Sequence, residues 1–336
     1  MKKNYEAWNV KVDNFPHDKN LRKQLEFLIK FAVLAPSTHN SQPWLFKIEK
    51  NRIEIRKNPS QTLDVADPND NLMYISIGCA LENLLVAANY YGFKYNLEYF
   101  FSDFDERVCE VSFRSKNGAK DDREHLIFLI KKRHSNRGKF RQDLPDETIL
   151  NTIKGFSTEG ISVDLVQQKK VKEKVVNIIL DAREKAFSDR SFRKELGSYQ
   201  RNNMTRSFTG MPGFTMGFPT ALSFFTPFVL NFVNVVKILR KKDKELLLEY
   251  TPAFFVISLD KISSKNCFMA GRIFERIALI AEKNGLATSF QEIPFYLEKM
   301  KETINTNNLP KILVRIGYPY QRMAHSPRFG SDKLIY

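Results

Sequence analysis

Apolar residues in the first third of the chain follow helix and strand periods in turn. From Leu25 to Leu34 they recur at the spacing of one helix face, and Pro36 ends this predicted helix. The other elements expected before residue 115 are strands at 44–48, 52–56, 95–101 and 108–114 and a helix at 76–91. Residues 1–20 are polar and are expected to form a surface arm.

A repeated pattern links two helices that are far apart in the sequence. In each, a glutamate follows an opening glycine by four residues, and a closing glycine follows it by fourteen. The anchors are Gly78, Glu82 and Gly92 in one copy and Gly271, Glu275 and Gly285 in the other. Two unrelated helices that each end in a glycine are the alternative, but identical spacing at three anchor residues favours duplication. We therefore expect two halves, at 21–120 and 124–330, joined by a charged connector.

Six consecutive polar residues, from Ser37 to Gln42, separate the first helix from the first strand. Pro43 closes this polar loop, which is longer than a plain connection needs to be. Its side chains offer uncharged donors and acceptors, which suit a neutral small molecule with many polar arms. A helix end followed by a turn is the plainer interpretation.

The order P-S-x-x-N-x-Q-P-W, from Pro36 to Trp44, resembles the flavin-contacting signature of nitroreductases. The K-R-H-S-N-R segment at 132–137 resembles that family's opening phosphate-binding segment, and 311–319 with Arg328 resembles its closing strand and basic tail. The resemblance extends from about Leu21 to Arg328 as two family units in tandem, as in single-chain Acg-like proteins. It implies an α+β fold in which the two halves pack as an intramolecular pseudo-dimer.

The family resemblance also implies an FMN site between the halves. Only the first-half loop and the second-half basic segment carry motifs, so one FMN per chain is expected. By this resemblance Arg133, Ser135 and Arg328 face the phosphate and ribityl chain, with Arg322 as an alternative to Arg328, and Arg137 lies near the pyrimidine ring. A solvated helix end is the plainer interpretation of Arg133 and Arg137. The full set assigned to FMN is Pro36, Ser37, Thr38, Asn40, Gln42, Arg133, His134, Ser135, Arg137 and Arg328, with a backbone N–H of Glu292 or Ile293 at the flavin N5.

The second half is longer than the first, and the extra residues lie mostly within an insertion at about 181–244. From Ser207 to Val236 the insertion contains no charged residue, and several basic residues follow. Glycines and prolines interrupt the apolar run, which argues against a membrane span. A span, or peripheral membrane contact through 207–242, remains an alternative. We expect residues 207–228 to form a lid over the flavin ring.

Charge and cysteine content exclude several classes of protein. The net charge is +15, from 53 basic and 38 acidic residues spread along the chain, and no nucleic-acid-binding motif accompanies it. Three cysteines without a C-x-x-C pair argue against a disulfide framework or a metal site and favour a reducing, cytoplasmic compartment. No apolar signal region follows the first residues.

The family resemblance implies an FMN-dependent oxidoreductase that passes electrons from NAD(P)H to a nitroaromatic, quinone or similar organic acceptor. No side chain is assigned as a catalytic acid or base. One alternative is a flavin-storage protein whose lid excludes nicotinamide, and another is an electropositive membrane-surface protein. The chain is expected to work as a pseudo-dimeric monomer or as a homodimer of such chains, with a small molecule as its partner.

Overall fold

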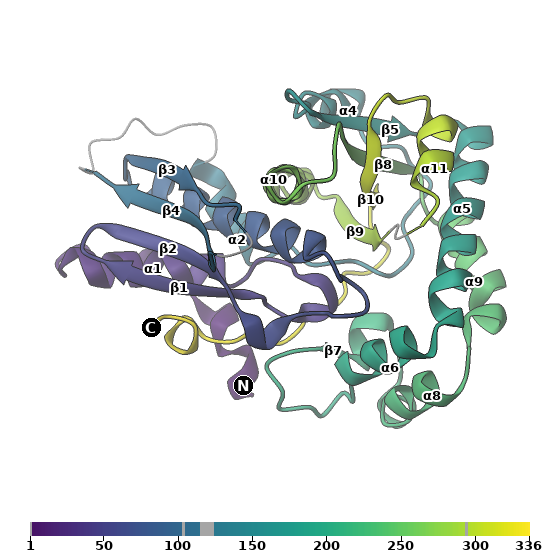
Figure 1. Ribbon diagram of the computed structural model, residues 1–336, viewed down its shortest axis with the longest axis horizontal. Helices are drawn as coiled ribbons and strands as arrows, with labels where there is room; N and C mark the ends of the chain where they lie inside the picture. Colours follow the sequence, from purple (N-terminus) through teal and green to yellow (C-terminus); the bar gives the residue numbers. More distant parts are fainter. Residues whose placement is uncertain (1, 103–104, 115–123, 293–294) are drawn as a thin grey trace.

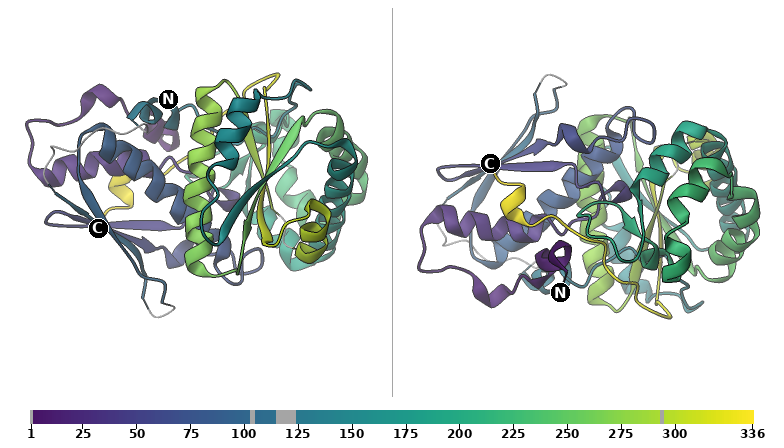
Figure 2. Two further views of the ribbon diagram at one scale, coloured as in Figure 1. Left: turned by 90° about the horizontal axis from the view of Figure 1, so that it is seen from above. Right: turned by 90° about the horizontal axis from the view of Figure 1, so that it is seen from below.

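The computed structural model describes residues 2–102, 105–114, 124–292 and 295–336. Two antiparallel four-stranded sheets lie on either side of two long central helices, α2 (Asn71–Tyr90) and α10 (Ser264–Lys283), as Figures 1 and 2 show. Apolar side chains from both helices and from both sheets form one continuous core. This mixture of helices and largely antiparallel sheets confirms the predicted α+β class.

The first sheet has the order β1-β2-β4-β3, and all its neighbouring strands are antiparallel. Each expected strand and helix of this part is present, with ends shifted by a few residues. Its elements are α1 (Leu21–Ala32), β1 (Trp44–Glu49), β2 (Arg52–Lys57), β3 (Tyr95–Tyr99) and β4 (Arg107–Phe113). The Asn20 side chain caps α1 by accepting from the Lys23 N–H at 3.1 Å.

The second sheet has the order β5-β8-β10-β9. Numbered within each sheet along the chain, both orders read first, second, fourth, third. The elements are α4 (Glu147–Lys154), β5 (Ile161–Val166), β8 (Ala253–Leu259), β9 (Ala287–Glu292), α11 (Leu297–Ile304) and β10 (Leu309–Gly317). Equal strand orders are an expected consequence of duplication, so the topology supports the tandem organisation that we propose for the chain.

The two glycines that open the repeated pattern lie where α2 and α10 cross. The sequence pattern placed Gly78 and Gly271 at helix starts, which is wrong, because both lie inside helices that begin earlier. A Cβ on Gly78 would lie 2.1 Å from the carbonyl oxygen of Phe268, and one on Gly271 would lie 2.0 Å from that of Ile75. Each glycine therefore allows the backbone of the other helix to approach.

The two glutamates of the pattern are fully buried and face arginines. Glu82 of α2 accepts hydrogen bonds from Arg272 at 3.2 Å and from Arg276 at 2.8 Å, and both arginines belong to α10. Glu275 of α10 lies 3.1 Å from the Nε of Arg133. A buried carboxylate is tolerated when a cation pairs with it, so these contacts fix how α2, α10 and the basic segment fit together.

The insertion forms a group of short helices beside the second sheet. It begins within α5 (Lys169–Ser188) and ends within α9 (Val236–Glu249). Between them lie α6 (Arg190–Tyr199), β6 (Gln200–Arg201), β7 (Met211–Pro212), α7 (Thr220–Ser223) and α8 (Thr226–Phe232). The single-turn elements are η1 (Lys3–Asn9), η2 (Val12–Asn14), η3 (Thr38–Asn40), η4 (Pro59–Gln61), η5 (Glu124–Leu126), α3 (Ile127–Ile130), η6 (Gly213–Met216) and η7 (Ser331–Lys333). A second, smaller core fills the space between the second sheet and α5, α9 and α11.

In the described ranges, one helix, α2, is long and apolar enough to cross a membrane, with a mean hydropathy of 1.4. In the structure 94% of that stretch is buried by other parts of the protein, which is typical of a central core helix. The uncharged segment 207–236 is instead divided among β7, η6, α7 and α8. Each is much shorter than the roughly 20 residues a span needs. The alternative of a span in the insertion is therefore wrong for this structure.

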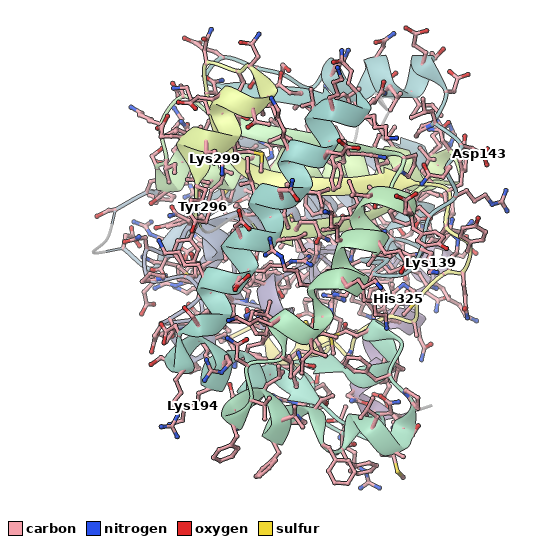
Figure 3. The ribbon with its side chains drawn as sticks, turned by 90° about the vertical axis from the view of Figure 1, so that its right-hand side faces the viewer. Lys139, Asp143, Lys194, Tyr296, Lys299 and His325 are labelled. Atoms are coloured by element: carbon pink, nitrogen blue, oxygen red, sulfur yellow. The ribbon has the colours of Figure 1, made fainter. Side chains whose placement is uncertain are left out.

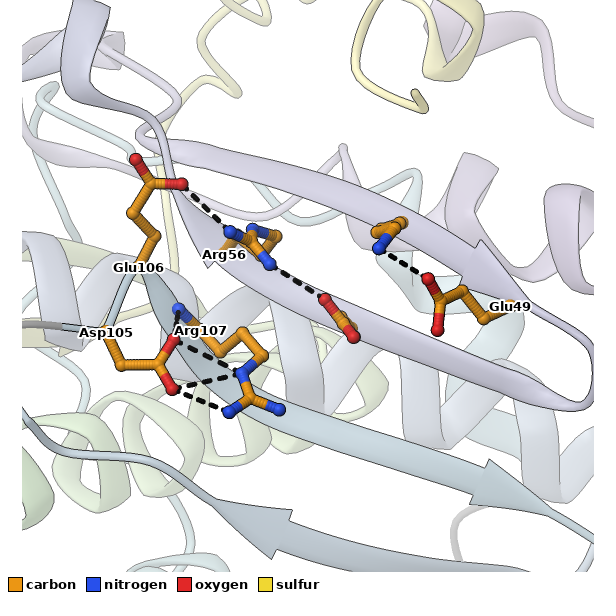
Figure 4. A network of polar contacts seen from close by, with 7 residues as sticks. Glu49, Arg56, Asp105, Glu106 and Arg107 are labelled. Atoms are coloured by element: carbon orange, nitrogen blue, oxygen red, sulfur yellow. Dashed lines mark hydrogen bonds and ion pairs between the residues drawn. The ribbon is translucent and has the colours of Figure 1, made fainter.

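Ion pairs cover part of the first sheet (Figure 4). Arg56 bonds to Glu54 and Glu106, each at 3.0 Å, and Arg107 binds the Asp105 carboxylate with two nitrogens. Lys47 forms an ion pair with Glu49 on the neighbouring part of the sheet. The more exposed pairs, such as Arg107 with Asp105, contribute about 0–1 kcal/mol each, whereas Glu54 is only 7% exposed. Their carboxylates balance the basic groups, so the positive surplus of the chain lies elsewhere.

Candidate functional site

The polar loop between α1 and β1 holds three residues in a left-handed backbone conformation. The φ angles of His39, Asn40 and Gln42 are 52°, 57° and 61°. Residues other than glycine adopt this region at a cost of about 1–3 kcal/mol each, and only where the surroundings impose it. The Ser37 hydroxyl accepts a hydrogen bond from the Gln42 N–H at 2.9 Å and closes the loop. Such a concentration of strain is typical of ligand-binding segments.

Two amides hold the polar loop against the insertion and the C-terminal tail. Asn40 donates to the carbonyl oxygens of Gly210 at 3.0 Å and Pro327 at 2.9 Å. Gln42 donates to the carbonyl of Phe208 at 2.7 Å and accepts from the N–H of Phe329 at 2.9 Å. The Gln42 side chain is fully buried and is not among the residues that line the two cavities described next, so it fixes the loop where the sequence suggested a direct ligand contact.

Two adjoining cavities lie in front of this loop, with volumes of about 160 and 40 Å³. They share five lining residues, which come from the loop, the basic segment and the insertion. The larger cavity is lined by Pro36, Ser37, Thr38, His39, Ile75, Ser76, Cys79, Ser135, Arg137, Met211, Phe274 and Phe290. The smaller is lined by Trp8, Pro36, Ser37, Asn40, Arg133, His134, Ser135, Arg137, Met211, Ala324, His325, Ser326 and Arg328.

Most residues expected around the flavin therefore meet at one place, and the exceptions are few. Glu292 ends β9 with its backbone paired to Ile312, and Ile293 lies outside the described residues. Arg322 does not line either cavity and forms an ion pair with Glu282 at 2.6 Å. Of the two arginines considered for the phosphate, Arg328 is the one at the cavity.

Only the first part of the predicted lid, 207–228, lies against the site. Residues 208–211 lie on the polar loop, and the Met211 sulfur is 3.5 Å from a guanidinium nitrogen of Arg137. Phe224, Phe225 and Phe228, which the prediction also placed over the ring, are instead at least half exposed. The prediction is thus wrong for the second part of 207–228.

Sequence reasoning missed several residues that line the cavities. Phe274 directly precedes Glu275 of the repeated pattern, so its position on α10 could have been read from the repeat. Trp8 and His325 come from opposite ends of the chain, with ring centroids 4.0 Å apart, and nothing in their sequence neighbourhood signals this. The arm at 1–20 is also more buried than expected, since Val10 and Phe15 belong to the core.

Three guanidinium groups give the smaller cavity a positive potential. Among the described residues, no carboxylate lies within 4.0 Å of Arg137 or Arg328. Burial lowers the pKa of Arg328 to about 9, which still leaves it protonated at neutral pH. Burial, together with neighbouring positive charge, lowers the pKa of His39 to about 4 and that of His325 to about 3. Both imidazoles are therefore neutral, and an anion would relieve the repulsion.

Glu275, the carboxyl partner of Arg133, changes its protonation state near neutral pH. Burial raises its pKa to about 7, although the positive charge of Arg133 acts in the opposite direction. A folded-state pKa above the ordinary glutamate pKa of about 4.5 means that the folded protein binds this proton more tightly than the unfolded chain. Stability from this group is therefore present at low pH and is lost as the pH rises to about 7.

Glu275→Gln is expected to remove that pH dependence. Between about pH 5 and about pH 8 the wild type should lose stability relative to the variant, because only the wild type ionises a buried carboxyl there. Urea unfolding of both proteins across this range gives the difference directly, and other titrating groups cancel in it. Parallel stability profiles would contradict the assignment.

A larger cavity of about 510 Å³ lies away from this site, between the N-terminal segment, α1 and η7. Its lining includes Phe27, Lys30 and Lys333 but no residue of the polar loop or of the basic segment. The loop residues and arginines that could bind a flavin thus line the two smaller cavities and not this one.

Comparison with known proteins gives partial matches. No protein-family model matches the chain. Over 74 residues it is 32% identical to a Mycobacterium tuberculosis H37Rv protein whose name describes it as a candidate NAD(P)H nitroreductase. That match covers 22% of this chain and 20% of the relative, so the chain spans about a fifth of the length of the curated relatives that it matches.

Similar solved structures include several nitroreductases. The FMN-dependent nitroreductase NfnB from Mycobacterium smegmatis, in complex with NADPH, matches with a TM-score of 0.41 and 16% identity over 61% of this chain and 94% of its own. A family member from Clostridium novyi NT has a TM-score of 0.33 and 19% identity, and covers 63% of this chain and 92% of its own.

Proposed function

We propose that the chain is an FMN-binding oxidoreductase of nitroreductase type that transfers electrons from NAD(P)H to a nitroaromatic, quinone or similar organic acceptor. The observation that carries this proposal is the meeting of the strained polar loop with Arg133, Arg137 and Arg328 at one pair of cavities. When bound, FMN would supply the hydride and electron chemistry, for which amino-acid side chains have no equivalent.

The donors around the smaller cavity suit a phosphate dianion. Arg133, Arg328 and the hydroxyl of Ser135 can each donate, and charge-assisted hydrogen bonds contribute roughly 1.5–3 kcal/mol apiece. In the described part of the chain, Nε of Arg328 and Nε2 of His134 and His325 are buried without a hydrogen-bond partner. A phosphate oxygen would accept from Nε of Arg328. A ribityl hydroxyl would donate to Nε2 of His134, because Nδ1 of that ring lies 3.0 Å from the Lys132 carbonyl oxygen and carries the proton. Arg137 would stabilise negative charge on a reduced ring.

The cavities around Met211 are smaller than a ligand of the size of FMN requires. Cavities of about 160 and 40 Å³ fall below the roughly 300–1,000 Å³ usual for ligands of this size. Met211 is only 6% exposed, lines both cavities and belongs to the insertion, so we infer that its side chain moves when the ring enters. The residues present fit the cofactor chemically, and this one side chain limits its entry.

Met211→Ala is therefore expected to speed FMN binding. Displacing a buried methionine costs on the order of 1.5–3 kcal/mol, so removing it should accelerate association with the flavin-free protein about tenfold. Stopped-flow quenching of flavin fluorescence measures this rate. The matched control is Met204→Ala in the same insertion, since Met204 is 65% exposed and should change nothing. Equal rates for both variants would show that Met211 does not obstruct the site.

The tandem organisation predicts one FMN for each 336-residue chain. The second-half counterpart of the polar loop is a tight turn at 156–160, in which Thr158 and Ile161 bond to each other through their backbones. It offers no long polar segment to a second flavin. Absorbance of released flavin, set against protein concentration, gives the ratio. Two flavins per chain would contradict the pseudo-dimer proposal.

A storage protein remains the second candidate function. The bonds from Asn40 to Gly210 and from Gln42 to Phe208 hold the insertion on the loop, which favours retention of a flavin over exchange. Anaerobic titration with NADH and NADPH separates the two candidates. Bleaching of the flavin absorbance indicates an oxidoreductase, whereas an unchanged spectrum indicates storage.

We also propose that the protein works in a reducing, cytoplasmic compartment. Cys79, Cys109 and Cys267 are free and buried, and burial raises the pKa of each thiol, so they stay protonated. Either a single pseudo-dimeric chain or a homodimer is compatible with the proposal, because both halves of the site come from one chain.

A further inference from the structure

The insertion exposes a cluster of large apolar side chains at one end of the molecule. Phe225, Phe228 and Phe232 are 64%, 65% and 62% exposed, and Ile238 is 76% exposed. We call this cluster, made of Leu222, Phe224, Phe225, Phe228, Phe232 and Ile238, the apolar tip. In Figure 3 the short helices of the insertion form the lower end of the molecule, near the labelled Lys194. Exposed apolar clusters of this kind mark interaction sites.

The tip is a folded surface with a defined orientation. Phe225, Phe228 and Phe232 follow the spacing of a single helix face, and the rings of the last two have centroids 4.7 Å apart. The opposite side of α8 packs on α6, where a Cβ on Gly197 would lie 3.1 Å from the carbonyl oxygen of Pro227. Because α6 fixes the inner side of α8, the phenylalanines point outward as part of the packed structure.

The segment that carries the tip is strongly basic. Residues 190–244 contain ten lysines and arginines and only two acidic residues. Lys194, Arg206, Lys237, Lys241 and Lys242 are exposed, and no ion pair within the described ranges uses them. Arg240, in contrast, is neutralised by Asp181 at 2.8 Å and Glu184 at 3.0 Å. The cations beside the tip are therefore available to an acidic partner.

We propose that the apolar tip docks the protein on an anionic lipid bilayer, with α7 and α8 lying in the interface. Exposed aromatic side chains can enter the boundary between headgroups and acyl chains, and each nearby lysine or arginine adds about 1 kcal/mol of attraction to anionic lipid. A second copy fits this surface less well, because pairing the tips would bring two basic surfaces of the +15 chains together. The proposal does not depend on the flavin.

Flotation with lipid vesicles tests this docking on the intact protein. Vesicles of phosphatidylcholine with phosphatidylglycerol should bind it, vesicles of phosphatidylcholine alone should bind it much less, and high salt should release it. Phe228→Asp/Phe232→Asp is expected to weaken binding at least about tenfold. The matched control is Phe128→Asp, a 47% exposed phenylalanine on α3 outside the insertion, which should bind like the wild type.

A pair of charge reversals tests the electrostatic part of the docking. Lys241→Glu, beside the tip, should reduce vesicle binding several-fold, whereas Lys299→Glu should not, because Lys299 lies toward the opposite end of the molecule in Figure 3. Circular dichroism confirms that each variant is folded. The docking proposal is overturned if the wild type does not float with anionic vesicles, or if Phe228→Asp/Phe232→Asp floats unchanged. A concentration-dependent dimer that only this double variant abolishes, without vesicle binding, would assign the tip to self-association instead.

Discussion

Arg133→Met/Glu275→Gln is expected to bind FMN at least about tenfold more weakly than Glu275→Gln alone. Both variants lack the buried carboxylate, so they differ only in the guanidinium that would face the phosphate. A charge-assisted bond to a phosphate oxygen contributes roughly 1.5–3 kcal/mol, which corresponds to a factor of ten or more in affinity. Fluorescence titration of the flavin-free proteins with FMN measures the difference.

The paired design is needed because Arg133 has a structural partner. Its Nε lies 3.1 Å from the Glu275 carboxylate, and both side chains are almost fully buried. Arg133→Ala alone would remove the counterion of that carboxyl group and change its protonation, which would confuse binding with folding. Glu275→Gln should bind FMN at least as well as the wild type, because a carboxylate no longer competes with phosphate for the guanidinium.

Riboflavin, which lacks the phosphate, is the control for this prediction. It should bind Glu275→Gln and the double variant about equally, since neither change touches a group assigned to the ring. If the double variant loses riboflavin and FMN affinity to the same degree, Arg133 stabilises the loop and tail and does not bind phosphate.

Local patterns in the sequence predicted the elements and the place where they meet. The strands and helices of the first half could be predicted because apolar and polar residues alternate regularly in the strands and apolar residues recur at helical spacing in the helices. The polar loop and the basic segment were readable because their residue order is distinctive, and the structure places both at one cavity. Such signals depend on neighbours in sequence, so they identify segments well.

Side-chain direction within those segments could not be predicted. Asn40 and Gln42 belong to the polar loop, but left-handed backbone angles turn their amides toward the insertion and the tail. A residue type does not reveal such an angle unless it is glycine. Trp8 reaches the cavity through a contact with His325 at the other end of the chain, and no local pattern encodes a contact of that separation.

The apolar tip shows how a general rule can mislead. Large exposed apolar surfaces are uncommon, so the sequence favoured a prediction in which the phenylalanines are buried over the flavin. The contact between α6 and α8 uses the opposite side of α8 and leaves the aromatic face outward. The same composition is therefore compatible with a lid or with a docking surface, and only the helix packing distinguishes them.

Gly78→Ala and Gly271→Ala are each expected to destabilise the protein by on the order of 3 kcal/mol. The added Cβ would lie about 2 Å from a backbone carbonyl oxygen of the facing helix, so no side-chain rotation can relieve the contact. The two helices must separate, and core contacts on both sides of the crossing are lost. Urea unfolding measures the change in free energy.

Two comparisons make this prediction specific to the helix crossing. Gly155→Ala is the matched control, because its Cβ would meet only carbonyls of its own helix end, at 3.3 Å and beyond, and should change stability by about 0.5 kcal/mol or less. The double variant Gly78→Ala/Gly271→Ala should cost less than the two single changes added together, because one separation of α2 from α10 accommodates both methyl groups. Additive costs, or single variants as stable as Gly155→Ala, would mean that the two glycines do not share one crossing.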